Sequence, residues 1–392
     1  MHIEGIESIE TMDIDYAREL GYNIKHIALA KRTNSQVECR SHPVLIHKSN
    51  ILSNIDGVMS AVRSRGDRFG ISLLYGHGAG GDATASAVIS NISDYCDYGA
   101  KSLKGGHDML REYNVLRNLK SQFNQVPEVH LYCDKTDVIG APFYIMDRVE
   151  GYIIRPNLHQ EDSPGKEVIE NVSNSLVSTL VELHNVDIQK ANLNSLGNVE
   201  GYIKRQIDGW IKRYNHSKTD SIADMDFIAS WLNENQPSEV RGSIIHNDFK
   251  YDNLVLDKEN FSKIIAVLDW EMATIGDPFM DLGTTLGYWV DKNDLPELKL
   301  FQLSATTLDG NPSREGILDM YERKSGKTIP NPVFYYVYGL FKIAVIAQQI
   351  YFRYKKGYTK DRRFSILNLA VMSLSVMAKQ AIVKKRLSDL FE

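Results

Sequence analysis

Residues 244–255 read IIHNDFKYDNLV, and residues 264–271, which follow after a short gap, read IIAVLDWE. The first run fits the spacing H-x-D-x-x-x-x-N, in which Asp248 is followed five residues later by Asn253. The second run has the apolar composition of a buried strand and places Asp269 at its end. A turn-forming DKEN sequence lies between the two runs, so we expect loop, strand, hairpin turn and strand in that order.

These three polar residues are of the types that a phosphoryl-transfer site requires. Transfer of the γ-phosphoryl group of ATP depends on positioning and on neutralising charge more than on covalent chemistry. Asp248 would accept the proton of the attacking hydroxyl or orient it, while Asn253 and Asp269 would hold Mg²⁺ through oxygen atoms. The sequence therefore predicts a catalytic Asp248 and a metal site at Asn253 and Asp269, with ATP and Mg²⁺ as cofactors.

Taken alone, the first spacing is equally consistent with a hydrogen-bonded turn between strands, because short polar motifs recur by chance. The strand that ends in Asp269, together with GDPFMDL at residues 276–282, favours phosphoryl transfer. Within this last segment we expect Asp281 to accept backbone N–H groups and brace the loop. For Glu271, a solvated or helix-capping role and a metal-binding role are both left open.

The composition is typical of a globular protein with two or three domains: 392 residues, of which 43% are hydrophobic and 24% charged. The net charge of −5 gives no reason to expect nucleic acid or an anionic membrane as a partner. The three cysteines lie far apart without a C-x-x-C pair, which fits a reducing compartment. The most apolar window, residues 334–350, contains Tyr, Gly, Lys and Gln and predicts a buried helix in preference to a membrane span. We therefore expect a cytoplasmic protein with no nucleic-acid or membrane partner.

The sequence pattern changes near residue 95, from one typical of strands to one typical of helices. Ahead of it, short runs rich in Val, Ile and Leu predict strands at residues 24–30, 37–46, 57–63 and 69–75, followed by a helix at 83–92. Beyond it, periodicity predicts helices at residues 107–119, 168–184, 199–214, 222–233, 296–302, 314–325, 332–354 and 362–383, with strands at 129–133 and 142–146. We therefore expect an α+β chain in three parts: residues 1–95, a junction at residues 96–106, and residues 107–392.

Two elements that usually accompany such a site are not found ahead of residue 107. A nucleotide loop between two strands, and a strand that carries a phosphate-binding lysine, are expected there. Lys101 and Lys104 lie in the glycine-containing junction, where a solvated linker charge is the better interpretation. The segment GHGAGG at residues 76–81 fits G-x-G-x-x-G, but it leads into a predicted helix and no strand with an acidic ribose ligand follows. The sequence therefore predicts a truncated N-terminal lobe.

Several further motifs accompany the catalytic runs: REYNVL at 111–116, IGAPFYIM at 139–146, VEG at 149–151 and the apolar residues 334–353. With these motifs, residues from about 107 to 381 resemble the aminoglycoside phosphotransferase and choline kinase superfamily. More narrowly, they are similar to the kinase-like domain attached to some acyl-CoA dehydrogenases. The resemblance implies a protein-kinase-like fold with a mainly helical C-lobe, and phosphorylation of a small-molecule hydroxyl group by Mg-ATP. Asp248 resembles the catalytic aspartate of this family, and Asn253 and Asp269 resemble its metal ligands.

The same resemblance implies which residues hold the nucleotide. Glu112 resembles the glutamate that pairs with the phosphate-binding lysine, although by itself it fits a solvated helix charge better. Four residues would form the hinge over which adenine lies: Met146, Asp147, Arg148 and Val149. By analogy, residues 199–233 and the helices from 314 onward would line the acceptor pocket. The nearby aromatic residues fit core or rim positions better than selective contacts: Trp210, Tyr214, Tyr288 and Trp289.

The first part of the chain carries a different set of motifs: EGI at 4–6, LGYNIK at 20–25, HPVLI at 42–46, NIDGV at 54–58 and YGHGAGG at 75–81. With these, residues 3–92 resemble homoserine dehydrogenase, in the later half of its substrate and dimerisation domain. This resemblance implies a homodimer formed through the N-terminal sheet. Since the cofactor domain and the acidic, lysine-bearing segment of that enzyme are not among these residues, we expect no dehydrogenase activity from them alone.

Three interpretations stay open at this point. The first is a small-molecule kinase whose turnover is weak because nucleotide contacts are lost. The second is a homoserine dehydrogenase-related assembly or binding module without catalysis of its own. The third is a dehydrogenase subunit completed by a separate cofactor domain. The acceptor itself is not readable, since kinases near this family act on aminoglycosides, choline, homoserine and hydroxyacyl groups.

Overall fold

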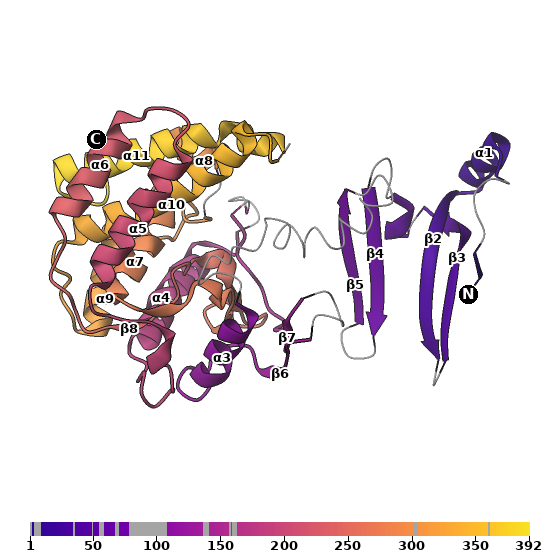
Figure 1. Cartoon of the computed structure of the whole chain (residues 1–392), viewed down its shortest axis with the longest axis horizontal. Helices are drawn as coiled ribbons and strands as arrows, with labels where there is room; N and C mark the ends of the chain where they lie inside the picture. Colours follow the sequence, from indigo (N-terminus) through magenta and orange to yellow (C-terminus); the bar gives the residue numbers. More distant parts are fainter. Residues whose placement is uncertain are drawn as a thin grey trace. The chain divides into compact units, whose positions relative to one another are not determined.

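The chain forms two compact units in the computed structural model, Met1–Leu103 and Lys104–Glu392, and each is described by itself (Figure 1). The structure describes residues 2–3, 9–33, 36–48, 50–54, 59–66, 70–77, 108–135, 141–156, 158, 163–301, 304–359 and 361–392. The helix predicted at 83–92 and the junction at 96–106 lie outside these residues. The three-part division at residues 95 and 107 therefore stays a prediction.

Antiparallel strand pairs make up most of the first unit. β2 (Tyr22–Thr33) and β3 (Gln36–His47) pair along their whole length, and β1 (His2–Ile3) lies parallel to β3 on its other side. β4 (Met59–Gly66) and β5 (Gly70–His77) form a second pair. All four predicted strands are confirmed, and β2 and β3 extend beyond the predicted limits because their pairing continues to the hairpin end.

A helix that the sequence patterns did not predict, α1 (Thr11–Glu19), lies ahead of β2. It begins with a capping interaction in which the Glu10 N–H donates to Asp13 Oδ2 at 2.9 Å. Of its residues only Ala17 is buried. The helix therefore lacks the apolar periodicity on which a prediction from sequence depends.

The second unit begins with a small helix and strand layer. α3 (Met109–Leu119) buries Val115, Leu116 and Leu119, and it packs against the antiparallel pair β6 (Val129–Cys133) and β7 (Phe143–Met146). The predicted helix and both predicted strands are confirmed. In the described part of residues 108–165, β6 and β7 are the only strands. The truncated N-lobe stays a prediction, because the residues directly ahead of 108 lie outside the described ones.

Eight helices and two short strand pairs form the described remainder of this unit. The helices are α4 (Lys166–His184), α5 (Tyr202–Ser217), α6 (Ala223–Glu234), α7 (Pro278–Tyr288), α8 (Pro296–Leu300), α9 (Arg314–Ser325), α10 (Pro332–Lys355) and α11 (Leu367–Lys384). The antiparallel pairs are β8 (Ser243–Ile245) with β11 (Thr274–Gly276), and β9 (Leu254–Leu256) with β10 (Ile264–Val267). The short 3₁₀ turns are η1 (Ile51–Asn54) in the first unit and, in the second, η3 (Asn194–Leu196), η4 (Tyr251–Asn253), η5 (Trp270–Met272) and η6 (Arg362–Ile366).

The predicted helices are confirmed with shifts at their ends. α8 ends at Leu300, short of the predicted residue 302, and the segment predicted as one helix at 362–383 begins with η6. α7 was not predicted as a helix. Its residues from Pro278 to Gly287 are all buried, including the polar Asp281, Thr284 and Thr285.

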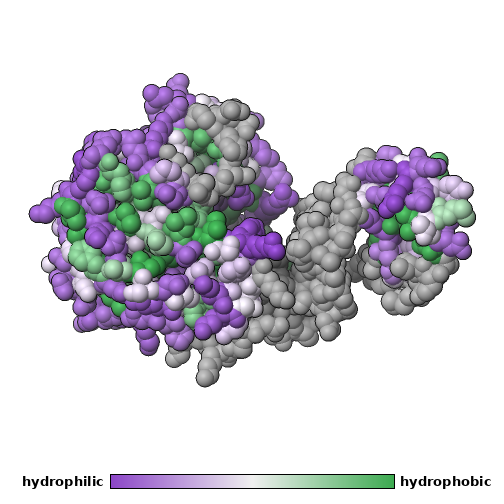
Figure 2. Space-filling model, turned by 90° about the horizontal axis from the view of Figure 1, so that it is seen from above, coloured by the Kyte–Doolittle hydropathy of each residue, from purple (hydrophilic) through white to green (hydrophobic). Residues whose placement is uncertain are grey.

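α10 is the central helix of the second unit and packs against α5, α6, α7 and α11 (Figure 1). By length and composition, Pro332–Lys355 and Arg362–Lys384 could each cross a membrane, but 78% of the apolar window is buried in the first and 44% in the second. The first value is that of a core helix. Along the second segment Ile366, Met372 and Val383 are exposed, and Figure 2 shows apolar areas on the upper face of the larger unit.

α7 and α10 cross at two glycines. A Cβ atom added at Gly283 would collide with the carbonyl oxygen of Tyr335, and one added at Gly339 would collide with the carbonyl oxygen of Gly283. These neighbours are backbone atoms, which cannot rotate away as a side chain could. The two helices therefore touch backbone to backbone at this crossing.

Candidate active site

The loop from His246 to Asn253 connects β8 to β9, so both of its ends are fixed by strand pairing. The hairpin predicted between β9 and β10 is confirmed, with Leu256 paired to Ile264. Just beyond β10, the Leu268 N–H donates to the Asn253 carbonyl oxygen at 2.8 Å. This bond places the end of the loop beside Asp269, whose backbone turns with φ of +67°. Residues that the sequence separates thus meet at one point.

Asp248 is bound on two sides within the loop. Asn253 Nδ2 donates to the Asp248 carbonyl oxygen at 2.8 Å and to its Oδ2 at 2.9 Å. Lys250 Nζ lies 3.1 Å from the same Oδ2. Burial is the largest single influence and acts to raise the pKa of Asp248, but the charge and hydrogen bond of Lys250, together with the charges of His246 and Lys342, hold the pKa below its ordinary value. The carboxylate is therefore ionised at neutral pH.

Asp281, on the first turn of α7, braces the loop from behind. It is fully buried and accepts the His246 N–H at 2.7 Å and the Asn247 N–H at 2.6 Å. His184 Nε2 lies 3.2 Å from Asp281 Oδ2, and its Nδ1 lies 2.7 Å from the Tyr321 hydroxyl. Burial acts to raise the pKa of Asp281, but the bond from His184 and the backbone N–H groups hold it below its ordinary value. The predicted bracing role of Asp281 is confirmed.

The His246 ring ties the loop to the end of β10. Its Nε2 lies 2.9 Å from the Leu268 carbonyl oxygen, and its Nδ1 accepts the Asp248 N–H at 3.2 Å. A ring that donates from Nε2 and accepts at Nδ1 is the neutral tautomer. His246 therefore positions the backbone of Asp248 and does not present a free nitrogen to a substrate.

Glu112, on the first turn of α3, lies against Tyr144 of β7. Burial, the charge of Glu112, a hydrogen bond to Glu112 and the charge of Asp269 raise the pKa of Tyr144, in that order of size. Glu112 is half-buried and, like Asp269, lies close enough to Tyr144 to affect its pKa. Its neighbour Arg111 holds α3 to the segment after Asp269, with Nη1 donating to the Glu271 carbonyl oxygen at 3.2 Å.

The predicted hinge follows β7 directly. Met146 ends the strand, and the Asp147 N–H donates to the Glu128 carbonyl oxygen at 2.8 Å. The Asp147 carboxylate lies 2.7 Å from His130 Nε2. Met146, Asp147 and Arg148 are exposed and Val149 is half-buried, so the segment keeps an accessible side.

Two residues to which the sequence analysis gave no role at Asp248, Tyr288 and Lys250, also lie beside this carboxylate. Tyr288, at the end of α7, donates to the Asp248 carboxylate, and its pKa is raised well above the ordinary value by burial and then by Asp248. Lys250 Nζ lies 4.6 Å from the centre of the Tyr288 ring. The core or rim position expected for Tyr288 is confirmed, since this half-buried residue packs against the core, and α7 also brings it close to the Asp248 carboxylate. Trp210, Tyr214 and Trp289 are buried in the core, as expected.

The donor set suits Mg²⁺ bound together with phosphate groups. Asn253 uses its amide nitrogen on Asp248, so its Oδ1 is the atom that would face a cation beside the Asp269 carboxylate. Mg²⁺ is usually held by one or two carboxylates plus substrate phosphates and water. The residues fit a phosphate-bound magnesium ion.

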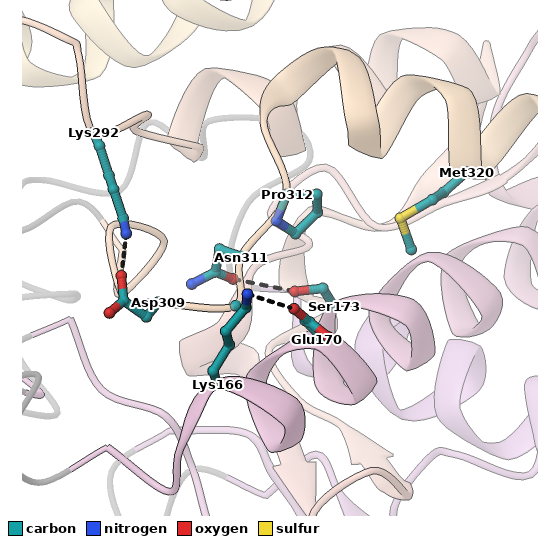
Figure 3. Close-up of a pocket in the computed structure, with 9 residues that line it drawn as sticks. Lys166, Glu170, Ser173, Lys292, Asp309, Asn311, Pro312 and Met320 are labelled. Carbon is teal, nitrogen blue, oxygen red and sulfur yellow. Dashed lines mark hydrogen bonds and ion pairs between the residues drawn. The ribbon is translucent and has the colours of Figure 1, made fainter.

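A cavity of about 670 Å³ adjoins the catalytic loop (Figure 3). Ser173 and Asn311 lie in its wall, and both bind the Tyr251 hydroxyl of the loop, at 2.8 and 2.7 Å. Figure 3 shows Lys166 paired with Glu170, and Lys292 paired with Asp309, around the same space. Its volume is that of a small-molecule pocket. α9 contributes Met320 to the lining, and none of the lining residues comes from 199–233. Which residues line the acceptor pocket stays a prediction.

Residues 100–314 match the phosphotransferase enzyme family over more than half of the sequence, so the chain belongs to that family. Residues 1–93 match homoserine dehydrogenase. A solved structure from Ralstonia eutropha, assigned as an aminoglycoside phosphotransferase, has a TM-score of 0.60 and 24% identity over 84% of this chain and 94% of that one. The fold is therefore confirmed as a kinase-like phosphotransferase fold, mainly helical in its C-terminal part, preceded by a homoserine dehydrogenase-like segment.

Among curated proteins, acyl-CoA dehydrogenase family member 11 of Rattus norvegicus is 34% identical over 301 residues, which is 73% of this chain and 38% of that protein. The Homo sapiens protein of the same name is 36% identical over 258 residues, 65% of this chain and 32% of that protein. Homoserine dehydrogenase of Neisseria gonorrhoeae is 48% identical over 93 residues, 24% of this chain and 21% of that protein. The chain thus spans less than two fifths of each of these relatives.

Proposed function

We propose that this chain transfers the γ-phosphoryl group of Mg-ATP to a hydroxyl group of a small molecule. The observation that carries the proposal is the meeting of Asp248, Asn253 and Asp269 through the Asn253–Asp248 and Leu268–Asn253 hydrogen bonds. An ionised carboxylate beside two oxygen ligands is what this reaction requires. Membership of the phosphotransferase enzyme family supports the same reaction class.

In this proposal Asp248 is the group that touches the acceptor. Its ionised carboxylate accepts a hydrogen bond from the acceptor hydroxyl and takes its proton as the new oxygen–phosphorus bond forms. The bond between the γ-phosphorus and the bridging oxygen breaks in the same step, and ADP leaves with that electron pair. Tyr288 and Lys250 contact the same carboxylate and fix its direction.

Asn253 and Asp269 would hold Mg²⁺, which when bound neutralises charge on the phosphate oxygens. We propose that Glu112 faces the nucleotide and that Met146 to Val149 contact the adenine. The sequence ahead of residue 107 shows neither a nucleotide loop between two strands nor an apolar strand that ends in a phosphate-binding lysine. Since a charge-assisted contact is worth about 1.5–3 kcal/mol, ATP binding should be weaker by about one to two orders of magnitude than in a site with that contact.

Calorimetry with the full chain tests this proposal. We expect a dissociation constant of about 0.1–1 mM for Mg-ATP. The contacts to the metal and to the hinge should still bind the nucleotide, and the missing lysine contact should weaken this binding. Removing Mg²⁺ should weaken binding further. An isotope assay with a panel of hydroxy compounds should then show transfer to at least one of them. No heat with Mg-ATP at millimolar concentration, together with no transfer, would rule the proposal out.

The homoserine dehydrogenase-like segment supports a second, non-catalytic role as an assembly module, and we propose that it forms a homodimer in the cytoplasm. β2 lies at the edge of its sheet among the described strands. Exposed edge strands readily pair with another chain. Light scattering of the full chain over a concentration series should show twice the monomer mass. A monomer at every concentration would contradict this role.

A further inference from the structure

Lys342, on α10, is buried beneath the catalytic loop. Its side chain is 1% exposed, and its Nζ donates to the Asn247 carbonyl oxygen at 2.7 Å, with Asn247 Oδ1 at 3.3 Å. Lys342 lies outside the runs that mark the site in the sequence. A buried ammonium loses its hydration, so its retention in a core helix needs a compensating role.

Asn247 is held from three directions. Its N–H donates to Asp281 Oδ1 at 2.6 Å, its Nδ2 donates to the Met272 carbonyl oxygen at 3.1 Å, and its own carbonyl oxygen accepts from Lys342. The residue has φ of +70°, a left-handed conformation that costs a non-glycine residue about 1 kcal/mol. Because Asn247 directly precedes Asp248, its peptide orientation sets the direction in which the Asp248 side chain leaves the backbone.

The ammonium lies among charges of both signs. The groups that face it are Asp281 on α7, Asp248 and Lys250 in the loop, and Arg213 on α5. The Trp210 ring of α5 lies 5.9 Å from Nζ. Burial lowers the pKa of Lys342 to about 8, against the attraction of Asp281 and Asp248. Lys342 is therefore charged at pH 7 and loses its charge as the pH rises through about 8.

We propose that Lys342 is a positioning residue: its ammonium holds the left-handed Asn247 peptide and thereby orients Asp248 for phosphoryl transfer. The inference rests on the proposed function for its catalytic consequence, but its structural consequence can be measured without turnover. Two variants separate charge from volume. Lys342→Met keeps the length and loses the charge, and Lys342→Arg keeps a cation that does not titrate in this range.

Hydrogen exchange of the full chain gives the structural readout. In Lys342→Met we expect peptides from residues 243–254 to exchange about tenfold faster or more, while those from α9 stay as in the wild type. Lys342→Arg should lie closer to the wild type. A second measurement needs only the wild type, in which residues 243–254 should lose protection between pH 7 and 9 after correction for intrinsic exchange. This measurement tests the inference even if a variant does not fold. Unchanged protection in both comparisons would overturn the inference.

Kinetics give the second readout. Lys342→Met should lower kcat by about tenfold to a hundredfold with little change in the KM for ATP, because a misdirected base affects the chemical step. The wild type should lose kcat as the pH rises through about 8, and Lys342→Arg should lack this alkaline limb. Loss of loop protection with no turnover in the wild type would contradict the proposed function and leave the role of Lys342 standing. Turnover with an unchanged kcat in Lys342→Met would contradict the role of Lys342 alone.

Discussion

Replacing Asp248 with asparagine should lower phosphoryl transfer by about 10²–10⁴-fold, the range for removal of a general base. In the wild type Asn253 Nδ2 donates to Asp248 Oδ2 at 2.9 Å. The asparagine keeps an oxygen that can accept this hydrogen bond, so the loop should keep its shape. What it loses is the ionised oxygen that receives the acceptor proton. Initial rates at saturating Mg-ATP, measured with the acceptor that the panel identifies, give the comparison.

Glu259→Gln is the matched control, because it removes one carboxylate from the exposed turn that follows β9. Its rate should equal that of the wild type. The Asp248 variant should bind Mg-ATP about as well as the wild type and melt within a few degrees of it. A rate within threefold of the wild type would remove Asp248 from its proposed role.

Replacing Arg314 with methionine should lower the free energy of unfolding of the second unit by about 3–5 kcal/mol, the range for breaking a buried ion pair. The guanidinium is fully buried and donates to Asp294 Oδ1 at 2.7 Å, and it lies 3.3 Å from Asp291. It also donates to the carbonyl oxygens of Trp289 and Leu387, at 2.9 and 2.6 Å. Methionine fills similar space but leaves two carboxylates without their cation.

Denaturant unfolding followed by tryptophan fluorescence measures this loss in the second unit alone, because all four tryptophans lie in it: Trp210, Trp231, Trp270 and Trp289. Lys204→Met is the control, since Lys204 pairs with Asp208 on the surface of α5 with 67% and 53% of the two side chains exposed. It should change stability by less than about 1 kcal/mol. Adding Asp291→Asn and Asp294→Asn to Arg314→Met should restore part of the loss, because the stranded charges are then gone. Equal effects of Arg314→Met and Lys204→Met would show that the buried cluster contributes nothing.

The sequence was sufficient where the deciding residues are close along the chain. Asp248 and Asn253 share one loop, and a single hairpin returns the chain to Asp269, so local spacing alone predicts their meeting. The long amphipathic helices were predicted for the same reason, since their periodicity is visible within one window. Whether these residues act as proposed stays a prediction until the kinetics are measured.

The rest of the site depends on tertiary packing. Tyr288 reaches Asp248 because α7 packs on the loop, where the Thr285 hydroxyl donates to the Phe249 carbonyl oxygen at 2.9 Å. Lys342 reaches Asn247 from a separation of 95 residues. Neither contact corresponds to a motif within a short stretch of sequence. A lysine in an apolar helix looks only like an interruption of the apolar residues until its partner is known.

The glycine crossing of α7 and α10 has a consequence for how the loop is held. Gly283 lies two residues after Asp281, and Gly339 lies three residues before Lys342. These two charged groups grip opposite ends of Asn247, one at its N–H and the other at its carbonyl oxygen. The distance between Asp281 and Lys342 depends on how closely the backbones of α7 and α10 approach at the glycines. A single methyl group at this crossing would push the two helices apart and lengthen that distance. Two positions without side chains, Gly283 and Gly339, thus set the separation of Asp281 and Lys342 and with it the orientation of the peptide that precedes Asp248.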